Sequence, residues 1–183
     1  MDIVEFFELS CGKWFSHRTS HLLSTNQSES GKSNLQIEAL SNVDPGVTQL
    51  CAQYQIDSAQ ALCSARISWS GELNGKNQQS GSTLLVAIAN PNNPKEGKLL
   101  HQIDGTDQPP TPGRYILGED DALTLITETE DRFLEERLWF AGPNLRLRTS
   151  LLKQADGFST ASFCSEIRMG VTRPATPPSP PLG

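Results

Sequence analysis

Residues 144–150 read NLRLRTS, and this stretch decides how the rest of the chain is interpreted. Leucine, leucine and threonine alternate here with Arg146, Arg148 and Ser150, and such a period of two indicates a half-buried β-strand. Because successive side chains of a strand point to opposite faces, the two guanidinium groups and the hydroxyl share one face. On the outside of a sheet they would be a solvated stripe. Inside a concave sheet they would form a receptor for an anion.

Segments with strand character flank this stretch and fill most of the chain. They are residues 14–23, 34–40, 62–73, 81–89, 97–103, 113–118, 122–129, 132–141, 144–153 and 158–169. Most of the connections between these predicted strands contain turn-forming residues, such as Asn74 with Gly75 and Asp156 with Gly157. Residues 24–33 (STNQSESGKS) predict a polar loop or hairpin tip. About ten strands, with a turn every 8–12 residues or so, predict an all-β sandwich or barrel.

Two short helices are predicted ahead of most of these strands. Residues 2–9 (DIVEFFEL) place apolar residues at helical spacing with carboxylates near the start, which predicts a short amphipathic helix. Asp44 followed by Pro45 is typical of an N-cap with proline at the first helical position, and predicts a second helix through Tyr54. The expected fold is therefore mainly β, with an N-terminal helix and one further short helix.

A barrel and a sandwich differ in what they enclose. An antiparallel sandwich fills its interior with apolar side chains, which leaves no inward place for two arginines. An up-and-down barrel of eight or more strands can hold one small ligand. The pair formed by Arg146 and Arg148 therefore favours an antiparallel barrel.

The composition is that of an ordinary globular protein, and 183 residues suit a single domain. The net charge of −6 would repel nucleic acid, so no nucleic-acid partner is expected. No run of about 18 apolar residues is present, so neither a transmembrane helix nor a membrane partner is expected. The first residues, MDIVEFFELS, lack the basic flank and apolar core of a signal peptide, which predicts a cytoplasmic location.

The end of the chain differs in composition from the rest. Five of the last ten residues are proline. Such a segment has almost nothing to bury. We therefore expect one domain over residues 1–171 and a disordered, proline-rich tail over residues 172–183.

Three further residues are candidates for a site because they fall on strand faces that are otherwise partly apolar. Trp69 is either a core tryptophan or a flat wall for an aromatic ligand. Glu136 has leucines on the same strand face, where a carboxylate is costly unless it is paired, so it either meets an arginine or awaits a donor from a ligand. Arg18 poses the same question in the first strand. Together with NLRLRTS, these residues describe an apolar cavity that contains several charges.

Metal-dependent and hydrolytic chemistry find little support in the sequence. His17 and His21 would share a face in either a helix or a strand, but no third ligand stands at a suitable spacing, so no metal site is expected. The four cysteines form no CxxC pair, which argues against a zinc site and against a disulfide framework. No GxSxG or HExxH pattern is present.

Several segments resemble one known family. The GKW of residues 12–14 is similar to the GxW signature of lipocalin-like barrels. The segments CGKWFSHRTSH (residues 11–21), EERLWFAGPNLRLRTS (135–150) and SEIRMG (165–170) resemble the S-type phycobiliprotein lyases, the CpcS/CpeS family. The resemblance extends from Met1 to about Gly170, and the run WFAGPNLRLRTS carries most of it. Residues 141–142 depart from the family pattern, which has a serine-like residue before the proline.

The resemblance implies a lipocalin-like or fatty-acid-binding-like antiparallel barrel of about ten strands. It implies a lyase that binds an open-chain tetrapyrrole, phycocyanobilin or phycoerythrobilin, and attaches it by a thioether to a cysteine of an apo-phycobiliprotein subunit. The bilin would be a substrate, with no cofactor and no metal. A homodimer, or a heteromer with a related lyase subunit, is a further expectation. The positions that match the bilin pocket of the family are Arg18, Trp69, Glu136, Arg146, Arg148 and Ser150.

The chemistry of a bilin suits these residue types. Its two propionates need charge-assisted donors, which Arg146, Arg148 and Ser150 would supply, with Arg18 as a helper. Its pyrrole N–H groups need an acceptor, for which Glu136 is the candidate and also the catalytic candidate. A carrier that stores a bilin or a fatty acid in the same barrel, and transfers nothing, is the alternative function.

Overall fold

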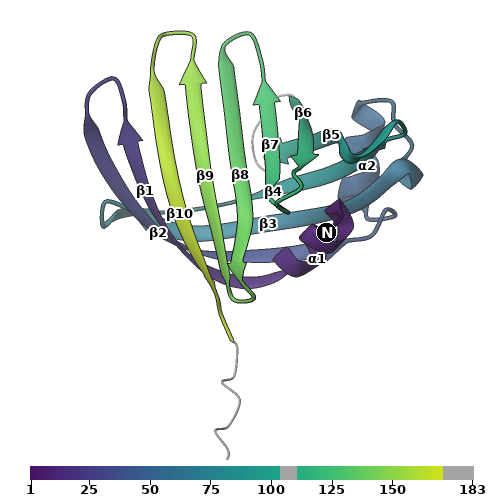
Figure 1. The fold of residues 1–183 in the computed structure, drawn as a ribbon, viewed down its shortest axis with the longest axis horizontal. Helices are drawn as coiled ribbons and strands as arrows, with labels where there is room; N and C mark the ends of the chain where they lie inside the picture. The colour runs from purple at the N-terminus through teal and green to yellow at the C-terminus, as the bar shows by residue number, and fades with distance from the viewer. Residues whose placement is uncertain (104–110, 171–183) are drawn as a thin grey trace, which may run out of the picture.

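A computed structural model describes residues 1–103 and 111–170 of the chain. Over these residues ten antiparallel strands close into a barrel in which each strand pairs with the next and β1 also pairs with β10 (Figure 1). The strands are β1 (Gly12–Leu22), β2 (Gln27–Leu40), β3 (Ala61–Leu73), β4 (Lys76–Asn90), β5 (Asn93–Ile103), β6 (Thr111–Leu117), β7 (Leu123–Glu128), β8 (Arg132–Gly142), β9 (Leu145–Gln154) and β10 (Ser159–Arg168). The prediction of a ten-stranded antiparallel barrel is confirmed.

The helix α1 (Ile3–Ser10) covers one end of the barrel. Its start is fixed by a capping box, in which the Asp2 carboxylate accepts from the Glu5 backbone N–H at 2.9 Å and the Glu5 carboxylate accepts from the Asp2 N–H at 2.8 Å. Phe6 and Phe7 are buried and pack into the core inside the barrel. The hydrophobic face of this helix therefore forms the floor of the barrel interior.

The helix α2 (Pro45–Gln53) lies outside the barrel and is followed by the short 3₁₀ helix η1 (Ser58–Gln60). Asp44 caps α2 by accepting from the Gly46 N–H at 2.8 Å, as predicted from the sequence. The buried residues of α2 form a second core with residues on the outer faces of β4 and β5, namely Val47, Leu50, Cys51, Leu84, Val86, Ile88 and Leu100. Two cores, one on each side of the sheet, therefore hold β4 and β5 in place.

Of the two possibilities predicted for residues 24–33, a polar loop or a hairpin tip, the hairpin tip is observed, but it is confined to residues 23–26. Residues from Gln27 onward belong to β2, and the β1–β2 connection is only a tight turn. Residues 27–30 are exposed or half-buried, because the β1–β2 hairpin projects beyond the core (Figure 1). Water reaches both faces of a strand there, so the sequence shows no apolar alternation.

The β1–β2, β7–β8 and β9–β10 hairpins project on the side of the barrel away from α1 (Figure 1). They form the rim of the barrel interior at its open end. The last described strand, β10, ends at Arg168. The predicted proline-rich tail lies outside the described residues, so its disorder and the boundary at residue 171 remain predictions.

Candidate functional site

The barrel encloses a cavity of about 330 Å³ between α1 and the open end. Apolar side chains from β2, β3, β4 and β7 form much of its wall, among them Leu35, Ile67, Leu85 and Leu125. Charged side chains from β1, β8, β9 and β10 form another part of the wall. The cavity lining contains five of the six predicted site residues, namely Arg18, Trp69, Glu136, Arg146 and Arg148.

Arg146 points into the barrel but is not a free cation. Its Nε donates to the Glu166 carboxylate at 2.6 Å, and the two side chains are 5% and 0% exposed. The guanidinium carbon also lies 5.1 Å from the centre of the Trp14 ring, within the range of a cation–π interaction. Burial lowers the pKa of Arg146, and the Glu166 carboxylate opposes that shift. Arg146 and Glu166 therefore form a buried ion pair.

Arg148 links this pair to Glu136. Its Nη1 donates to Glu136 Oε1 at 3.2 Å, and its Nη2 lies 3.4 Å from Glu166 Oε1. Burial opposes the charge on Arg148, but the carboxylates of Glu136 and Glu166 outweigh burial and raise its pKa. Arg148 and Glu136 are both about one quarter exposed, at 28% and 26%. They are therefore the part of the charged wall that a molecule in the cavity can reach.

The four side chains form one alternating series, in the order Arg146, Glu166, Arg148, Glu136. Two positive and two negative charges cancel, so this wall is not the simple anion receptor that the arginines of NLRLRTS suggested. Of the two possibilities predicted for Glu136, pairing with an arginine is the one observed. A carboxylate ligand that binds at this series must therefore share Arg148 with Glu136.

Glu166 is the residue that the sequence reasoning missed. Cys164 and Glu166 lie on the inner face of β10, two residues apart, and Glu166 is the register partner of Arg146 on β9. In the sequence, Glu166 is distinguished only by standing two and four residues after Cys164 and Ser162, which places all three on one face of β10. This spacing is informative only once it is known that this face points into the barrel.

Arg18 lies on the inner face of β1 near the open end. It lines the main cavity and a smaller hollow that also includes Arg148. Unlike Arg146 and Arg148, it forms no hydrogen bond or ion pair with any residue in the described part of the chain. Arg18 is also exposed, so its donors are available to a ligand without the loss of an existing pair.

Trp69 on β3 is both a core residue and a cavity wall. It packs against the inner core and lines the cavity. Its cross-strand partner on β4 is Gly81, and a Cβ added there would lie 2.5 Å from the indole Cζ2. The missing side chain of Gly81 therefore makes room for the indole to lie against the sheet.

Ser150 is the predicted site residue that does not line the cavity. It is paired in register with Glu136 on β8 and with Ser162 on β10, on the same strand face as the two arginines. It therefore lies next to the charged series without belonging to the observed cavity surface.

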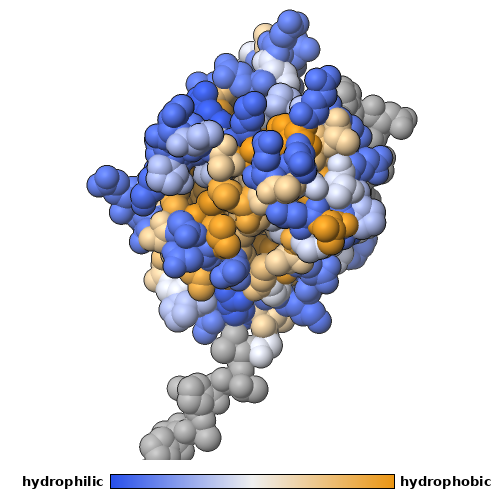
Figure 2. Space-filling view, turned by 90° about the vertical axis from the view of Figure 1, so that its right-hand side faces the viewer, coloured by the Kyte–Doolittle hydropathy of each residue, from blue (hydrophilic) through white to orange (hydrophobic). Residues whose placement is uncertain are grey.

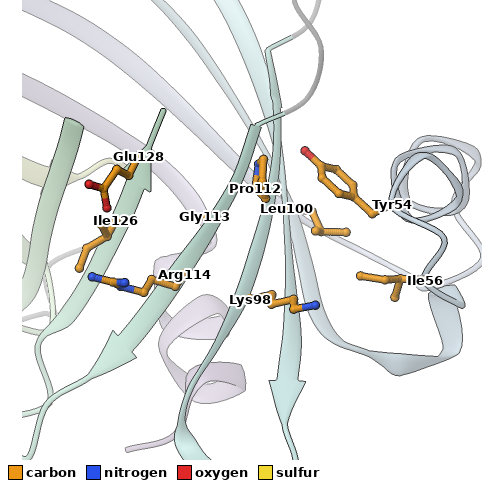
Figure 3. A pocket seen from close by; sticks show the side chains of 9 residues that line it. All are labelled: Tyr54, Ile56, Lys98, Leu100, Pro112, Gly113, Arg114, Ile126 and Glu128. Atoms are coloured by element: carbon orange, nitrogen blue, oxygen red, sulfur yellow. The ribbon is translucent and has the colours of Figure 1, made fainter. Parts of the chain in front are cut away.

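A second hollow of about 310 Å³ lies outside the barrel (Figure 3). Tyr54 and Ile56 contribute to it from the segment after α2, and Lys98, Leu100 and Arg114 contribute from β5 and β6. On the side of the molecule where α2 lies, apolar residues reach the surface in patches separated by polar ones (Figure 2). The outer hollow contains none of the predicted site residues, so the barrel interior is the candidate site.

Neither a metal-binding cluster nor a membrane-spanning helix is found over residues 1–103 and 111–170. Within these ranges, no cluster of three or more His, Cys, Asp or Glu side chains is close enough to hold a metal ion. No helix in the same ranges has the length and apolar character needed to cross a membrane.

Comparison with known proteins agrees with the barrel fold. The family model described as CpeS-like protein matches residues 2–169. This chain belongs to the CpeS-like family. Among CpeS-like relatives, a protein of Thermosynechococcus vestitus named chromophore lyase CpcS/CpeS is 57% identical over 176 residues, covering 96% of this chain and 97% of the relative.

Two further CpeS-like proteins extend the comparison. The phycocyanobilin lyase subunit CpcS of a Picosynechococcus species is 38% identical, over 96% of this chain and 89% of that protein. The solved structure of the S-type phycobiliprotein lyase CPES from Guillardia theta has a TM-score of 0.85 and 33% identity, and the match covers 94% of this chain and 95% of that chain. The CpeS-like fold therefore extends over nearly the whole of the described chain.

Proposed function

We propose that this CpeS-like protein is a chromophore lyase, which binds an open-chain tetrapyrrole in its barrel and attaches it to a cysteine of a phycobiliprotein subunit. The observation that carries this proposal is a cavity with one apolar wall and one wall of alternating charges, in a family whose members are named as lyases. A bilin has the matching character, because its conjugated rings are apolar on both faces while its propionates and ring nitrogens are polar.

The charged wall assigns roles to the predicted residues. Arg18 is the first candidate for a propionate, because its donors are free in the described structure, and Arg148 is the second. Glu136 uses one carboxylate oxygen on Arg148 and keeps the other for a pyrrole N–H. Arg146 holds Glu166 and thereby positions Arg148, rather than binding the ligand alone. Trp69 forms a wall against the ring system.

The reaction is an addition. The acceptor thiolate attacks the ethylidene carbon of ring A, a C–S bond forms, the carbon–carbon π bond breaks, and the thiol proton ends on the ring carbon. No electrons are gained or lost overall and nothing leaves, so the bilin is a substrate and the step itself requires no redox cofactor. Holding the bilin in one orientation is then the main contribution of the protein.

The Cys63 thiol is a poor competitor of the acceptor thiol. Cys63 lies on the inner face of β3 among the residues packed near α1, and burial raises its pKa to about 12. It stays protonated at neutral pH and is a poor nucleophile there. Capture of the bilin by Cys63 is therefore disfavoured.

Partners beyond the bilin follow from the same proposal. The acceptor is an apo-phycobiliprotein subunit, and we expect its cysteine to approach the open end of the barrel, opposite α1. A homodimer, or a heteromer with a related lyase subunit, stays a prediction, as does the cytoplasmic location. The alternative, a carrier that transfers nothing, is not favoured because the relatives are named as lyases.

The test is a transfer assay. The protein is mixed with phycocyanobilin or phycoerythrobilin and with separate apo-phycobiliprotein subunits, and the acceptor is then denatured in acid and examined for covalently bound bilin. We expect acid-stable bilin on one acceptor cysteine, at a rate well above that of a mixture without the protein. An acceptor whose cysteine is replaced by serine is the control. Tight bilin binding without transfer to any acceptor would support the carrier instead.

A further inference from the structure

His101 on β5 is an inner-face residue to which the roles above give no part. It lines the same cavity as Glu136 and is the register partner of Leu85 on β4. The neighbouring inward residue, Leu99, is 2% exposed and belongs to the core. His101 therefore stands where the apolar floor of the barrel gives way to the cavity.

The imidazole of His101 has no hydrogen-bond partner among the residues that the structure describes. His101 is half-buried in the cavity wall, a position where a leucine or methionine would pack without the cost of taking ring nitrogens out of water. Other histidines in the chain do not share this setting, since His17 and His21 lie on exposed outer positions of β1. The position of His101 is therefore unexplained by packing alone.

The charge state of His101 is set by its surroundings. Burial lowers its pKa, the Glu136 carboxylate raises it, and Arg132 lowers it, with burial the largest effect and a net lowering. At neutral pH the ring is therefore uncharged, with one nitrogen that donates and one that accepts. A neutral imidazole can meet either an N–H or an imine nitrogen of a ligand.

The barrel places His101 and Glu136 on different parts of the cavity wall. His101 comes from β5 and Glu136 from β8, and β6 and β7 lie between these two strands. A flat ligand in the cavity would thus meet Glu136 along one part of its edge and His101 along another. The two residues are not interchangeable contacts to the same atom.

We propose that His101 makes a hydrogen bond to the nitrogen edge of the bound bilin and selects one of its two end-to-end orientations. This inference rests on the proposed function. The two propionates of a bilin stand on its central rings and are nearly related by a twofold exchange of its ends. Arginine contacts to the propionates therefore discriminate poorly between ring A and ring D at the open end. His101 on β5 and Glu136 on β8 are unlike groups on different strands, so their combined contacts to the ligand differ between the two orientations, and addition at ring A requires one of them.

The experiment compares His101→Leu with His101→Gln, each titrated with phycocyanobilin and monitored by visible absorbance. The loss of one neutral hydrogen bond predicts about 2- to 10-fold weaker binding in His101→Leu. We also expect a changed spectrum of the bound bilin, and a fall in the single-turnover transfer rate, at saturating bilin, that exceeds the fall in affinity. Glutamine can hydrogen-bond but does not titrate near neutral pH, so His101→Gln should recover much of the affinity and rate.

His17→Leu is the matched control, because it removes a histidine from the exposed outer face of β1 and should behave as wild type. Thermal melts of all variants separate misfolding from loss of contact. Wild-type affinity, spectrum and transfer rate in His101→Leu would overturn the inference. If wild-type protein binds bilin but transfers none, the proposed function fails, and the binding and spectra still decide whether His101 touches the ligand.

Discussion

At the scale of single residues, the buried pair of Arg146 and Glu166 changes what an arginine in the barrel is expected to do. An inward arginine without a partner would be a liability in the empty barrel, and its removal would leave stability unchanged or raise it. Arg146 instead neutralises a carboxylate that is fully buried. Its replacement would remove the closer of the two cations that neutralise Glu166.

Arg146→Ala should therefore lower the free energy of unfolding, but by less than the ~3–5 kcal/mol that a buried charge without any partner costs, because Arg148 still lies 3.4 Å from Glu166. Arg18→Ala should leave stability almost unchanged, because Arg18 has no ion-pair partner in the described structure, and should mainly weaken bilin binding. Urea unfolding and bilin titration of both variants measure the two effects. Equal urea unfolding curves for Arg146→Ala and wild type would show that the Arg146–Glu166 pair contributes nothing to stability.

Glu136→Gln should leave the fold intact and change the colour of the bound bilin. The amide has the size of the carboxylate and can still accept from Arg148, but it carries no charge to stabilise a protonated tetrapyrrole. We expect a smaller population of the red-shifted, protonated bilin in the absorbance spectrum. A spectrum identical to wild type would mean that Glu136 does not contact the chromophore.

The limits of sequence reasoning at this scale are visible in Glu166. The period of two next to leucines placed Arg146 and Arg148 on one strand face, but left open whether that face points inward. The counter-ion lies 20 residues further along, and its contact with Arg146 depends on the β9–β10 register. Nothing in residues 144–150 encodes that register, so the charged series is a property of the closed sheet.

At the scale of single elements, the two faces of β9 have different surroundings. Its inner face carries the charges, while its outer face is covered by no helix of the described chain. Leu145 is 36% exposed there, and Leu147 is half-buried. Among the described residues, these leucines are therefore not buried under an outer layer.

Leu145→Ala should consequently cost about 1 kcal/mol or less of unfolding free energy, as is usual for partly exposed positions, with unchanged bilin affinity. Leu50→Ala in α2 is the contrast, because Leu50 is fully buried in the outer core. Its truncation should cost about 2–5 kcal/mol. Thermal melts compare the two, and similar losses in both would indicate that β9 is covered in solution.

Gly81→Ala tests whether ligand binding depends on the position of the Trp69 indole against the sheet. An added Cβ would lie 2.5 Å from the indole, so the ring must move off the sheet and toward the cavity. We expect altered tryptophan fluorescence and weaker bilin binding, with little loss of fold. Gly142→Ala on β8 is the control, since an added Cβ there meets no atom within 4 Å.

At the scale of the whole molecule, the strands were predictable from their apolar patterns and turns, whereas the choice of a barrel over a sandwich rested on the pair of Arg146 and Arg148. The exception is the beginning of β2, where exposed polar residues belong to a strand held by pairing with β1 rather than by burial. The position of α1 as a floor was not predictable. Its helical period is evident, but which end of the barrel it covers depends on packing of Phe6 and Phe7 against distant strands.

Truncation after Gly170 should leave both the melting temperature and bilin affinity unchanged. Residues 171–183 lie outside the described structure, and this expectation rests on their composition, with five prolines among the last ten residues. The full chain and the truncated chain are compared by thermal melt and bilin titration. A clear fall in either quantity would indicate that the last residues contact the barrel.

The closure of the barrel joins its first strand to its last, with Trp14 opposite Arg168 and Leu22 opposite Thr160. A ribosome completes β1 early and β10 only at the end, so a nascent chain carries an unpaired strand edge throughout most of its synthesis. Contacts so distant in sequence form slowly, and an open edge can pair with other chains. A chain arrested before β10 would also lack Glu166, the partner of Arg146. The chromophore therefore has no enclosed site until β10 has been translated. Binding of the chromophore then indicates that β1 and β10 have paired.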